Sequence, residues 1–361
     1  MSASGEIITV LGPIPANELG VTLMHEHLFI DLTCNFVYPD EATRQAYIET
    51  PVRMEILGLL RRFPFSLTLD NLRLFDEEVA REEVLRFKLG GGNAIVDCTV
   101  IGLRQDPLGL RRLARSTNLH IIQGTGVYVE PAHPDWIEQM GIDDIAELFV
   151  RDIEVGIRDT GVRAGFIGEI GTSGISKKRT DYGKVGDITD EEEKVLRAAA
   201  RASRHTGASV SVHLDPRGKG AFKVMDILME ESLSPDRMIM GHLDGHPDLD
   251  YHLAVADRGA FVEYDSLGRE YYADNIDLAF GSDVKRVELI KAMIDAGFAD
   301  QLLLSQDVCM KMDLRKYGGF GYDHIVTSGL LMFRQVGISE FDIEKMLVHN
   351  PARVLALAPS A

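Results

Sequence analysis

Short runs of apolar residues alternate with longer amphipathic stretches along most of the chain. The short runs are rich in Val, Ile and Leu and have the length of buried strands, whereas the longer stretches show helical spacing. The pattern therefore predicts repeated strand–helix units. Eight runs are predicted as strands: residues 21–30, 93–100, 120–128, 164–171, 208–214, 237–243, 259–266 and 301–307.

Two of the stretches between these runs carry clear helix signals. Residues 70–92 have acidic side chains early and end on glycines, and residues 189–207 open on Thr189 and Asp190 and close on Gly207. Such residues are typical of helix ends. Eight strands that alternate with helices, without a Pro/Ser/Gly-rich linker, favour a single α/β domain, a (β/α)8 TIM barrel over residues 1–361, rather than two domains.

The connection after the first strand is longer than a typical strand-to-helix loop. It contains a loop or lid insertion at about residues 31–72, which is long by the standard of such connections. In a barrel, the loops that follow the strands surround the mouth where chemistry takes place. We therefore expect this segment to pack over the barrel mouth.

Composition narrows the class of protein. The chain has 361 residues, of which 45% are hydrophobic and 26% charged, and no apolar run approaches the roughly 20 residues of a membrane helix. A net charge of −18 disfavours nucleic-acid binding, which relies on clustered Lys and Arg. The first residues lack the basic and apolar regions of a secretory signal. We expect a cytoplasmic protein that acts on a small molecule, with no nucleic-acid or membrane partner.

The three cysteines, Cys34, Cys98 and Cys309, are scattered and show no CxxC spacing. This argues against a disulfide framework and against a zinc site built from thiolates. Any metal in this protein is therefore expected to have nitrogen and oxygen ligands.

Candidate chemistry begins with two histidines in the stretch MHEH. In a strand, side chains alternate between faces, so His25 and His27 point the same way, roughly 7 Å apart, and Glu26 points the other way. Two neutral imidazoles from one strand form half of a metal site. Taken alone, the stretch is equally compatible with a pair of hydrogen-bonded core histidines.

Polar residues at the ends of the other predicted strands extend this pattern. In a barrel, the carboxyl ends of the strands carry the site. Four imidazoles and two carboxylates are too many ligands for one zinc ion, but they suit two divalent ions about 3.5–4 Å apart that share a carboxylate and a hydroxide. A plain structural carboxylate inside GFIGEIG would be unfavourable. The six residues are His25, His27, Glu169, His213, His242 and Asp307.

The order and context of these residues resemble the phosphotriesterase-related family of the amidohydrolase superfamily. The resemblance runs from TVLGPIPANELGVTLMHEH through GTGVYVEPAHP, FIGEIGTS, SVHLDPRG and MGHLDGH to LSQD and GGFGYDHI. It implies a distorted barrel with two divalent ions at its mouth, usually Zn²⁺, with Mn²⁺ or Co²⁺ as alternatives, and a homodimer. It also implies a division of ligands: His25, His27 and Asp307 for the more buried ion, His213 and His242 for the other, and Glu169 as the bridge.

Glu169 departs from the best-known members of that family, which use a carboxylated lysine as the bridge. Both groups are bidentate monoanions, so the bridge is preserved, although the carboxylate of a glutamate lies closer to its backbone. A branch of the family that includes its vertebrate members has this glutamate and differs in what it hydrolyses. The substitution therefore argues against efficient phosphotriester hydrolysis.

Five further residues are candidates for the site. Tyr128 resembles a family position whose phenol faces the metal centre, although plain loop packing also accounts for it. Asp265 and Arg269 follow the seventh strand and either meet a polar substrate group or form a solvated ion pair. Asp244 and His246 follow His242 closely enough to support it or to relay protons, although an ordinary polar loop would contain the same residue types.

These observations predict a zinc-dependent hydrolase. A hydroxide between two ions would attack an electrophilic centre and Asp307 would accept its proton. We expect a lactone, a carboxylic ester or an N-acyl amide as substrate, with phosphotriesters cleaved slowly. Two alternatives remain: a true phosphotriesterase, and a metal-containing binding protein without turnover.

Overall fold

The computed structural model describes residues 5–177 and 186–359. Within these residues, eight parallel strands form one sheet whose spatial order follows the chain order. Each strand lies inside one of the predicted apolar runs and is shorter than that run. The strands are β3 (Thr22–Glu26), β6 (Ala94–Asp97), β7 (His120–Thr125), β8 (Phe166–Gly171), β9 (Val210–His213), β10 (Met238–Met240), β11 (Phe261–Tyr264) and β14 (Leu302–Leu304).

Glu26 joins the last strand to the first. As predicted, its side chain points away from the flanking histidines, and it accepts hydrogen bonds from the Ser305 hydroxyl (2.7 Å) and from the backbone N–H groups of Gln306 (2.9 Å) and Val308 (2.8 Å). The backbone N–H of Asp307 also donates to the carbonyl oxygen of His25 (3.1 Å). These bonds bring the end of β14 against β3, so the predicted (β/α)8 barrel is confirmed.

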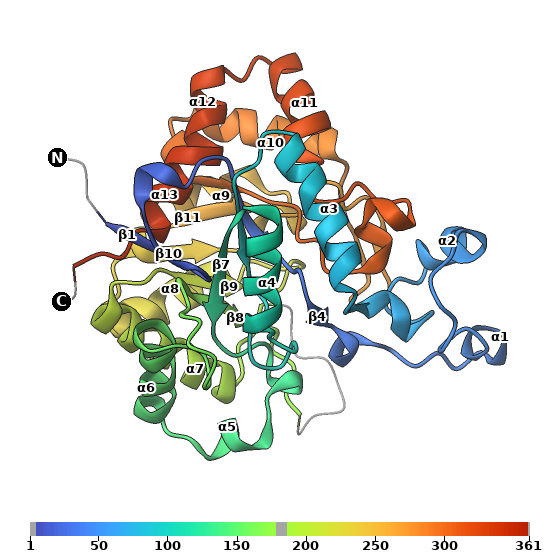
Figure 1. Cartoon of the computed structure of the whole chain (residues 1–361), viewed down its shortest axis with the longest axis horizontal. Coiled ribbons are helices and arrows are strands. Elements are labelled where there is room, and N and C mark those ends of the chain that lie inside the picture. Colours follow the sequence, from blue (N-terminus) through green and yellow to red (C-terminus); the bar gives the residue numbers. More distant parts are fainter. Residues whose placement is uncertain (1–4, 178–185, 360–361) are drawn as a thin grey trace.

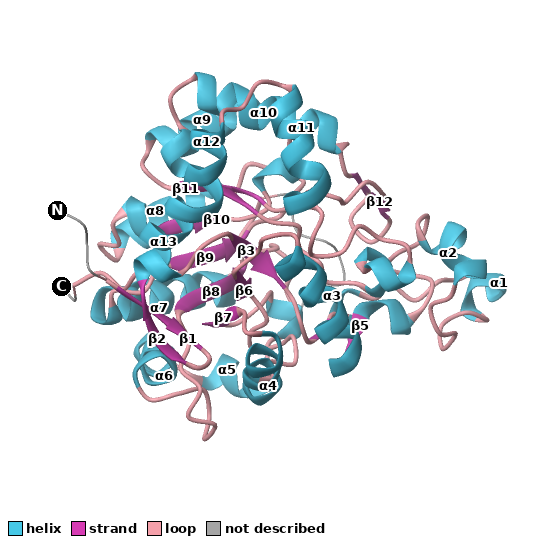
Figure 2. Cartoon of the chain, turned by 45° about the horizontal axis from the view of Figure 1, so that its top comes forward, coloured by secondary structure: helices cyan, strands magenta, loops and turns pink. Residues whose placement is uncertain are grey.

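Helices surround the strands on the outside of the barrel (Figure 2). Buried faces such as Val84 and Phe87 on α3 or Leu196 and Ala199 on α7 pack towards the strands. The helices between strands are α3 (Glu77–Leu89), α4 (Pro107–Thr117), α5 (Asp135–Gln139), α6 (Ile142–Glu154), α7 (Asp190–Thr206), α8 (Ala221–Glu230), α9 (Leu249–Asp257) and α10 (Asp283–Asp295), and α11 (Leu330–Gln335), α12 (Glu340–Glu344) and α13 (Asn350–Leu355) follow β14.

The two helix predictions met different outcomes. Thr189 caps α7, its hydroxyl accepting from the N–H of Glu192, and Gly207 ends the helix with a positive φ of 75°. The helix predicted over 70–92, however, begins only at Glu77. The side chain of Asp76 caps it there by accepting from two backbone N–H groups, and residues 73–74 instead form β5, which pairs with β4 (Ile30–Asp31).

The inside of the barrel is divided between an apolar end and a polar end. Met24, Val96, Phe166, Phe261 and Leu303 come from five different strands yet belong to one buried cluster. Side chains of well-separated strands meet in this way only inside a closed barrel. The hairpin of β1 (Glu6–Thr9) and β2 (Gly12–Pro15) contributes Ile7 to the same cluster and closes that end.

The long segment after β3 forms the part of the molecule farthest from the two termini (Figure 1). It contains α1 (Ala42–Gln45) and α2 (Met54–Leu60). The N–H of Phe65 donates to Asp274 (3.0 Å) and Lys311 contacts Asp70 (2.6 Å). The segment is thereby attached to the loops that follow β11 and β14, at the mouth of the barrel.

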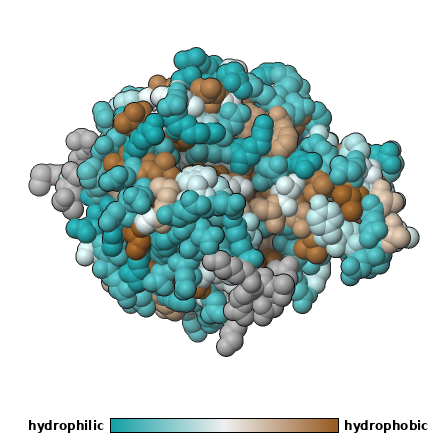
Figure 3. Space-filling view, turned by 90° about the horizontal axis from the view of Figure 1, so that it is seen from below, coloured by the Kyte–Doolittle hydropathy of each residue, from teal (hydrophilic) through white to brown (hydrophobic). Residues whose placement is uncertain are grey.

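The outer surface is mainly hydrophilic, with apolar residues scattered over the face seen in Figure 3. Some of the most exposed apolar side chains, Tyr38 and Met54, belong to the segment that carries α1 and α2. No helix within the described ranges has the length and apolar character needed to cross a membrane.

Candidate metal centre

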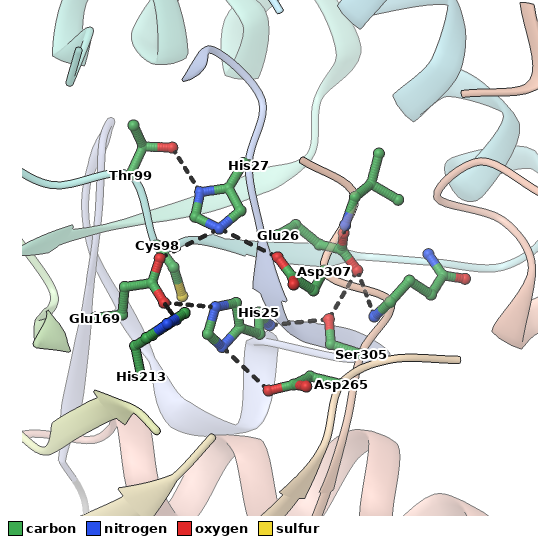
Figure 4. A network of polar contacts seen from close by, with 12 residues as sticks. His25, Glu26, His27, Cys98, Thr99, Glu169, His213, Asp265, Ser305 and Asp307 are labelled. Atoms are coloured by element: carbon green, nitrogen blue, oxygen red, sulfur yellow. Dashed lines mark hydrogen bonds and ion pairs between the residues drawn. The ribbon is translucent and has the colours of Figure 1, made fainter. Parts of the chain in front are cut away.

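The carboxylate of Glu169 lies at the centre of the polar end of the barrel (Figure 4). Its Oε2 is 3.0 Å from Nδ1 of His213, 3.3 Å from Nε2 of His25 and 3.7 Å from Nε2 of His242. Its Oε1 is 3.4 Å from Nε2 of His27. The structure thus brings together four histidines from β3, β9 and the end of β10 around one buried carboxylate on β8.

Asp307 completes the set of six predicted residues. Its Oδ1 lies 3.3 Å from Nε2 of His27. Asp307 and His242 both have a positive φ, 47° and 58° respectively, which is costly for residues other than glycine and is often found at functional positions. His242 comes shortly after β10 and Asp307 shortly after β14.

The donor atoms fit divalent cations. His25, His27 and Asp307 each offer one atom within 4.8 Å of the others, as do His25, Glu169 and His242. Nε2 of His25 is fully buried and has no hydrogen-bond partner among the described residues. Imidazole nitrogens and carboxylate oxygens are the ligands that zinc takes when thiolates are absent. The first group matches the predicted ligands of the more buried ion.

The pKa shifts divide the four imidazoles of the cluster into two pairs. Burial alone would raise the pKa of Glu169, but the surrounding histidines hold it well below its usual range. Burial lowers the pKa of His27 to about 4, and burial together with His242 lowers that of His213. Burial lowers the pKa of His25 as well, but Cys98 and Glu169 raise it well above its usual range, and the pKa of His242 is also raised. Because a metal ligand must be a neutral imidazole, His25 and His242 would each release a proton when an ion binds.

A second set of side chains holds the histidines from behind. Nδ1 of His27 lies 3.0 Å from the hydroxyl of Thr99, and Nδ1 of His25 lies 3.1 Å from Glu263. The hydroxyl of Tyr322, from the GYDHI motif, donates to the carbonyl oxygen of His27 (2.7 Å). Partners of this kind fix the orientation of an imidazole and leave its other nitrogen directed at the site.

Asp265 belongs to this supporting set, which corrects its predicted role. It is fully buried, accepts from the N–H of His242 (2.8 Å), and lies 2.9 Å from Nδ1 of the same residue and 3.4 Å from Nδ1 of His25. Burial lowers the pKa of His242, but Asp265 raises it to about 9, so the imidazole is a stronger base. Asp265 therefore positions histidines and does not reach the cavity above them.

Arg269 lines the cavity that opens above the four histidines, Glu169 and Asp307. It is not one half of a solvated ion pair. Its side chain is 7% exposed, one nitrogen contacts Asp307, and two others donate to the hydroxyl of Tyr271 (2.8 and 2.6 Å). The guanidinium therefore holds the Asp307 oxygen that does not face His27.

Asp244 supports the site through the backbone, and His246 lies elsewhere. Asp244 is buried and accepts from the N–H of Ser266 (3.0 Å) and from Nε of Arg286 (3.0 Å). The ring of His246 packs edge-on against Tyr251, with 6.3 Å between centroids, and is not among the described residues that line the cavity. The predicted support or proton relay through His246 is therefore corrected: its neighbour is an aromatic ring on α9.

The same buried network extends along the loop that carries Asp265 and Arg269. Asp283 accepts from the N–H of Gly268 (2.9 Å) and lies 2.6 Å from Nε2 of His324, the histidine of GYDHI. Arg286 bonds Asp283 and also donates to the carbonyl oxygen of Arg269 (3.0 Å). Three backbone groups of this loop are thus held by buried charged side chains.

A cavity of about 340 Å³ opens above the cluster. Tyr128 is one of its walls, and its ring meets His213 edge-on with 4.9 Å between centroids. His25, Asp265 and Glu263 are not among the described residues that line it. The polar residues at its base are His27, Glu169, His213, His242, Arg269 and Asp307.

Comparison with known proteins identifies the family. The model of the Phosphotriesterase family matches residues 5–355. The chain belongs to this family. It is 35% identical to the N-acetyltaurine hydrolase of Tetraodon nigroviridis, over 96% of this chain and 97% of that one, and 33% identical to the human N-acetyltaurine hydrolase, over 98% and 99%.

Two solved structures have a similar fold. A resiniferatoxin-binding protein from Rhodobacter sphaeroides superposes with a TM-score of 0.92 at 38% identity, covering 98% of this chain and 95% of that one. The lactonase Lmo2620 from Listeria monocytogenes gives 0.78 at 25% identity, covering 98% and 99%. The chain is thus a member of a hydrolase family, and the predicted resemblance is confirmed.

Several residues of the site were missed at the level of sequence. Glu263 sits inside the apolar run FVEY, the same signal that singled out Glu169, and Thr99 is the last polar residue of the second run, 93–100. Both were therefore within reach of the strand-end argument. Cys34 and Cys309, which line the cavity, and Arg286, on a helix, carried no such signal. All three cysteines are free, as expected.

Proposed function

We propose that this protein is a divalent-metal-dependent hydrolase that cleaves an N-acyl amide or a carboxylic ester, lactones included. The observation that carries the proposal is the buried carboxylate of Glu169, which faces His25, His213 and His242 through one oxygen and His27 through the other. Relatives named as an N-acetyltaurine hydrolase and a lactonase support it. Both names describe attack of water on an acyl carbonyl.

Each of the six residues has a proposed role. His25, His27 and Asp307 would hold the more buried ion, His213 and His242 would hold the other, and Glu169 would serve both. Zn²⁺ suits this donor set best, with Mn²⁺ or Co²⁺ as alternatives. Divalent ions in such a site supply a Lewis acid for the carbonyl oxygen and lower the pKa of a water molecule towards neutrality.

Asp307 is the proposed proton acceptor. One of its oxygens faces His27 and the other contacts Arg269, so the carboxylate is held at the base of the cavity. It takes the proton of the attacking water and delivers it to the leaving amine or alcohol. Arg269 keeps the side chain of Asp307 oriented through both transfers by its contact with the oxygen that does not face His27.

Two further properties are part of the proposal. Phosphotriesters are cleaved slowly, because the bridge is a glutamate and the supporting relatives act on acyl compounds. The protein also forms a homodimer, a prediction that sedimentation would test.

Binding without turnover is the second candidate. The similarity to a protein named for binding resiniferatoxin favours it. The two candidates differ in one measurable respect, which is whether a bound acyl compound is converted to its acid.

The test uses protein purified without chelator. Elemental analysis measures bound metal, and metal-loaded protein is then assayed with N-acetyltaurine, longer N-acyl amides, a lactone panel and paraoxon. We expect about two divalent ions per chain and a higher kcat/KM for an acyl compound than for paraoxon. A faster reaction with paraoxon would make it a phosphotriesterase. Binding of acyl compounds with no acid released would make it a binding protein.

A further inference from the structure

The cavity above the cluster has an apolar upper wall. Residues on two segments that are far apart in the chain build most of it. One segment follows β3 and the other follows β11, between β12 (Tyr272–Ala273) and α10. The main apolar lining residues are Leu32, Phe36, Phe65, Ile175, Ile276 and Phe280.

The cationic side chains of the cavity are already engaged. Two arginines are among the described lining residues, and no lysine is. Arg217 donates to Asp215 through Nε (2.9 Å) and Nη2 (2.7 Å), and Arg269 is held by Asp307 and Tyr271. An anionic substrate group such as a sulfonate would have to compete with a carboxylate already bonded to each guanidinium. Burial of an uncompensated charge is costly.

Asn275 carries a polar atom on this wall without a hydrogen-bond partner among the described residues. Oδ1 of Asn275 is buried without a hydrogen bond among the described residues, and Asn275 lines the cavity. A buried acceptor without a partner is unfavourable. A substrate N–H or O–H group would satisfy it.

We propose that this cavity is an acyl site for neutral substrates: an uncharged amide or ester whose apolar acyl or aryl group is much larger than acetyl. The inference rests on the proposed function and names its substrate class. A volume of about 340 Å³ falls in the range of cavities that enclose drug-sized ligands. The polar base receives the carbonyl group, and the apolar wall receives the acyl group.

The first test measures binding without turnover. Acetate, butanoate, hexanoate and phenylacetate are titrated calorimetrically into metal-loaded protein. All four carry the same carboxylate, so only the apolar part varies. Each buried methylene is expected to tighten binding about fourfold. Hexanoate is longer than acetate by four methylenes, so it is expected to bind about 250-fold more tightly if all four are buried and about 16-fold more tightly if only two are. Equal affinities for the four acids would overturn the proposal.

A matched pair of variants assigns the effect to the wall. Val37 lines the cavity and is 38% exposed, so Val37→Trp fills the space without disturbing the core. It is expected to weaken hexanoate binding at least about tenfold and to leave acetate unchanged. Val155→Trp, on an exposed helix end outside the cavity, is the control and is expected to change neither. An unchanged preference for hexanoate in Val37→Trp would contradict the assignment.

Rates of hydrolysis then test the effects of substrate charge and of acyl chain length. N-acetylethanolamine, N-hexanoylethanolamine and N-acetyltaurine differ only in acyl length or in the charge of the amine part. The hexanoyl compound is expected to have a kcat/KM at least about tenfold above that of the acetyl compound. N-acetyltaurine is expected to gain nothing from its sulfonate, and a clear preference for it would overturn the proposal.

The two levels of the proposal fail differently. If longer acids bind more tightly but no substrate is hydrolysed, the proposed function is wrong and the cavity is an acyl-binding site. Hydrolysis of acetyl compounds with no length dependence in binding or rate would keep the hydrolase and remove the acyl site.

Discussion

The base of the cavity and its wall are built in different ways. The base consists of short polar side chains at the ends of strands, and most of them are held by at least one further buried group, as His242 is by Asp265 and His27 by Thr99. The wall consists of apolar side chains on two loop segments, and it includes Val37 and Ile276, which remain partly exposed.

We infer from this difference that the base determines the reaction and the wall determines which substrates are accepted. Side chains on strands with buried hydrogen-bond partners keep a defined geometry, which metal binding and proton transfer require. Apolar walls on loops change shape and size at little cost to the fold. Changes at the base should therefore abolish the reaction on every substrate, whereas changes at the wall should alter which substrates are accepted.

Asp307→Asn is expected to give the largest effect. It keeps the shape of the side chain and removes the proton acceptor, so kcat should fall by roughly 10²–10⁴. The preference for hexanoate over acetate in binding should survive, because the wall is intact. Steady-state kinetics and metal analysis together check this. A variant with full metal content and the wild-type rate would show that another residue accepts the proton.

Glu169→Gln should remove one ion before the other. The change keeps size and one oxygen donor but removes the negative charge between two cations, so the metal content should fall from about two to about one per chain. High zinc or manganese should restore activity only in part. Elemental analysis at several metal concentrations measures this, and a content that stays at two would argue against a bridge.

The matched variant Glu169→Lys asks whether a carboxylated lysine can replace the glutamate. Its longer side chain does not fit a site shaped for glutamate, so added bicarbonate should rescue activity poorly. Full activity without bicarbonate would mean that the site does not need an anionic bridge.

Asp265→Asn should lower metal affinity by roughly 10–100-fold, because Asp265 orients His242 from behind. Competition with a chelator gives the affinity. Asp277→Asn is the control, because Asp277 is exposed, its carboxylate accepts from the hydroxyl of Tyr272, and it sits on the wall segment. Equal chelator sensitivity in the two variants would place Asp265 outside the support of the metal centre.

Tyr322→Phe is expected to give the smallest effect. It removes one hydrogen bond to the carbonyl oxygen of His27, worth about 0.5–1.5 kcal/mol in stability. Urea unfolding measures this loss, and kcat should fall only a few-fold. A drop as large as that of Asp307→Asn would mean that the hydroxyl acts in the reaction itself.

Much of the fold and of the base could be predicted because the signals are local. Each strand is an apolar run, and His213 or Asp307 ends such a run, so periodicity and position were sufficient. The helix predicted over residues 70–92 begins too early, because acidic residues before Glu77 are the signal for its first turn. In the structure Asp76 is the N-cap, so the helix begins after it. Asp265 and Arg269 were placed near the site, but their partners could not be predicted from adjacent residues.

The sequence by itself determined the barrel and the set of four histidines, Glu169 and Asp307 that the structure brings together, because strand periodicity and strand ends are properties of neighbouring residues. Only the tertiary structure decided that Arg269 contacts Asp307, that Asp265 lies behind His242, and that Arg286 holds their loop. It also decided that Phe36 and Phe280 line one cavity. Such pairings depend on how segments far apart in the chain pack, and one sequence carries no local signal for them.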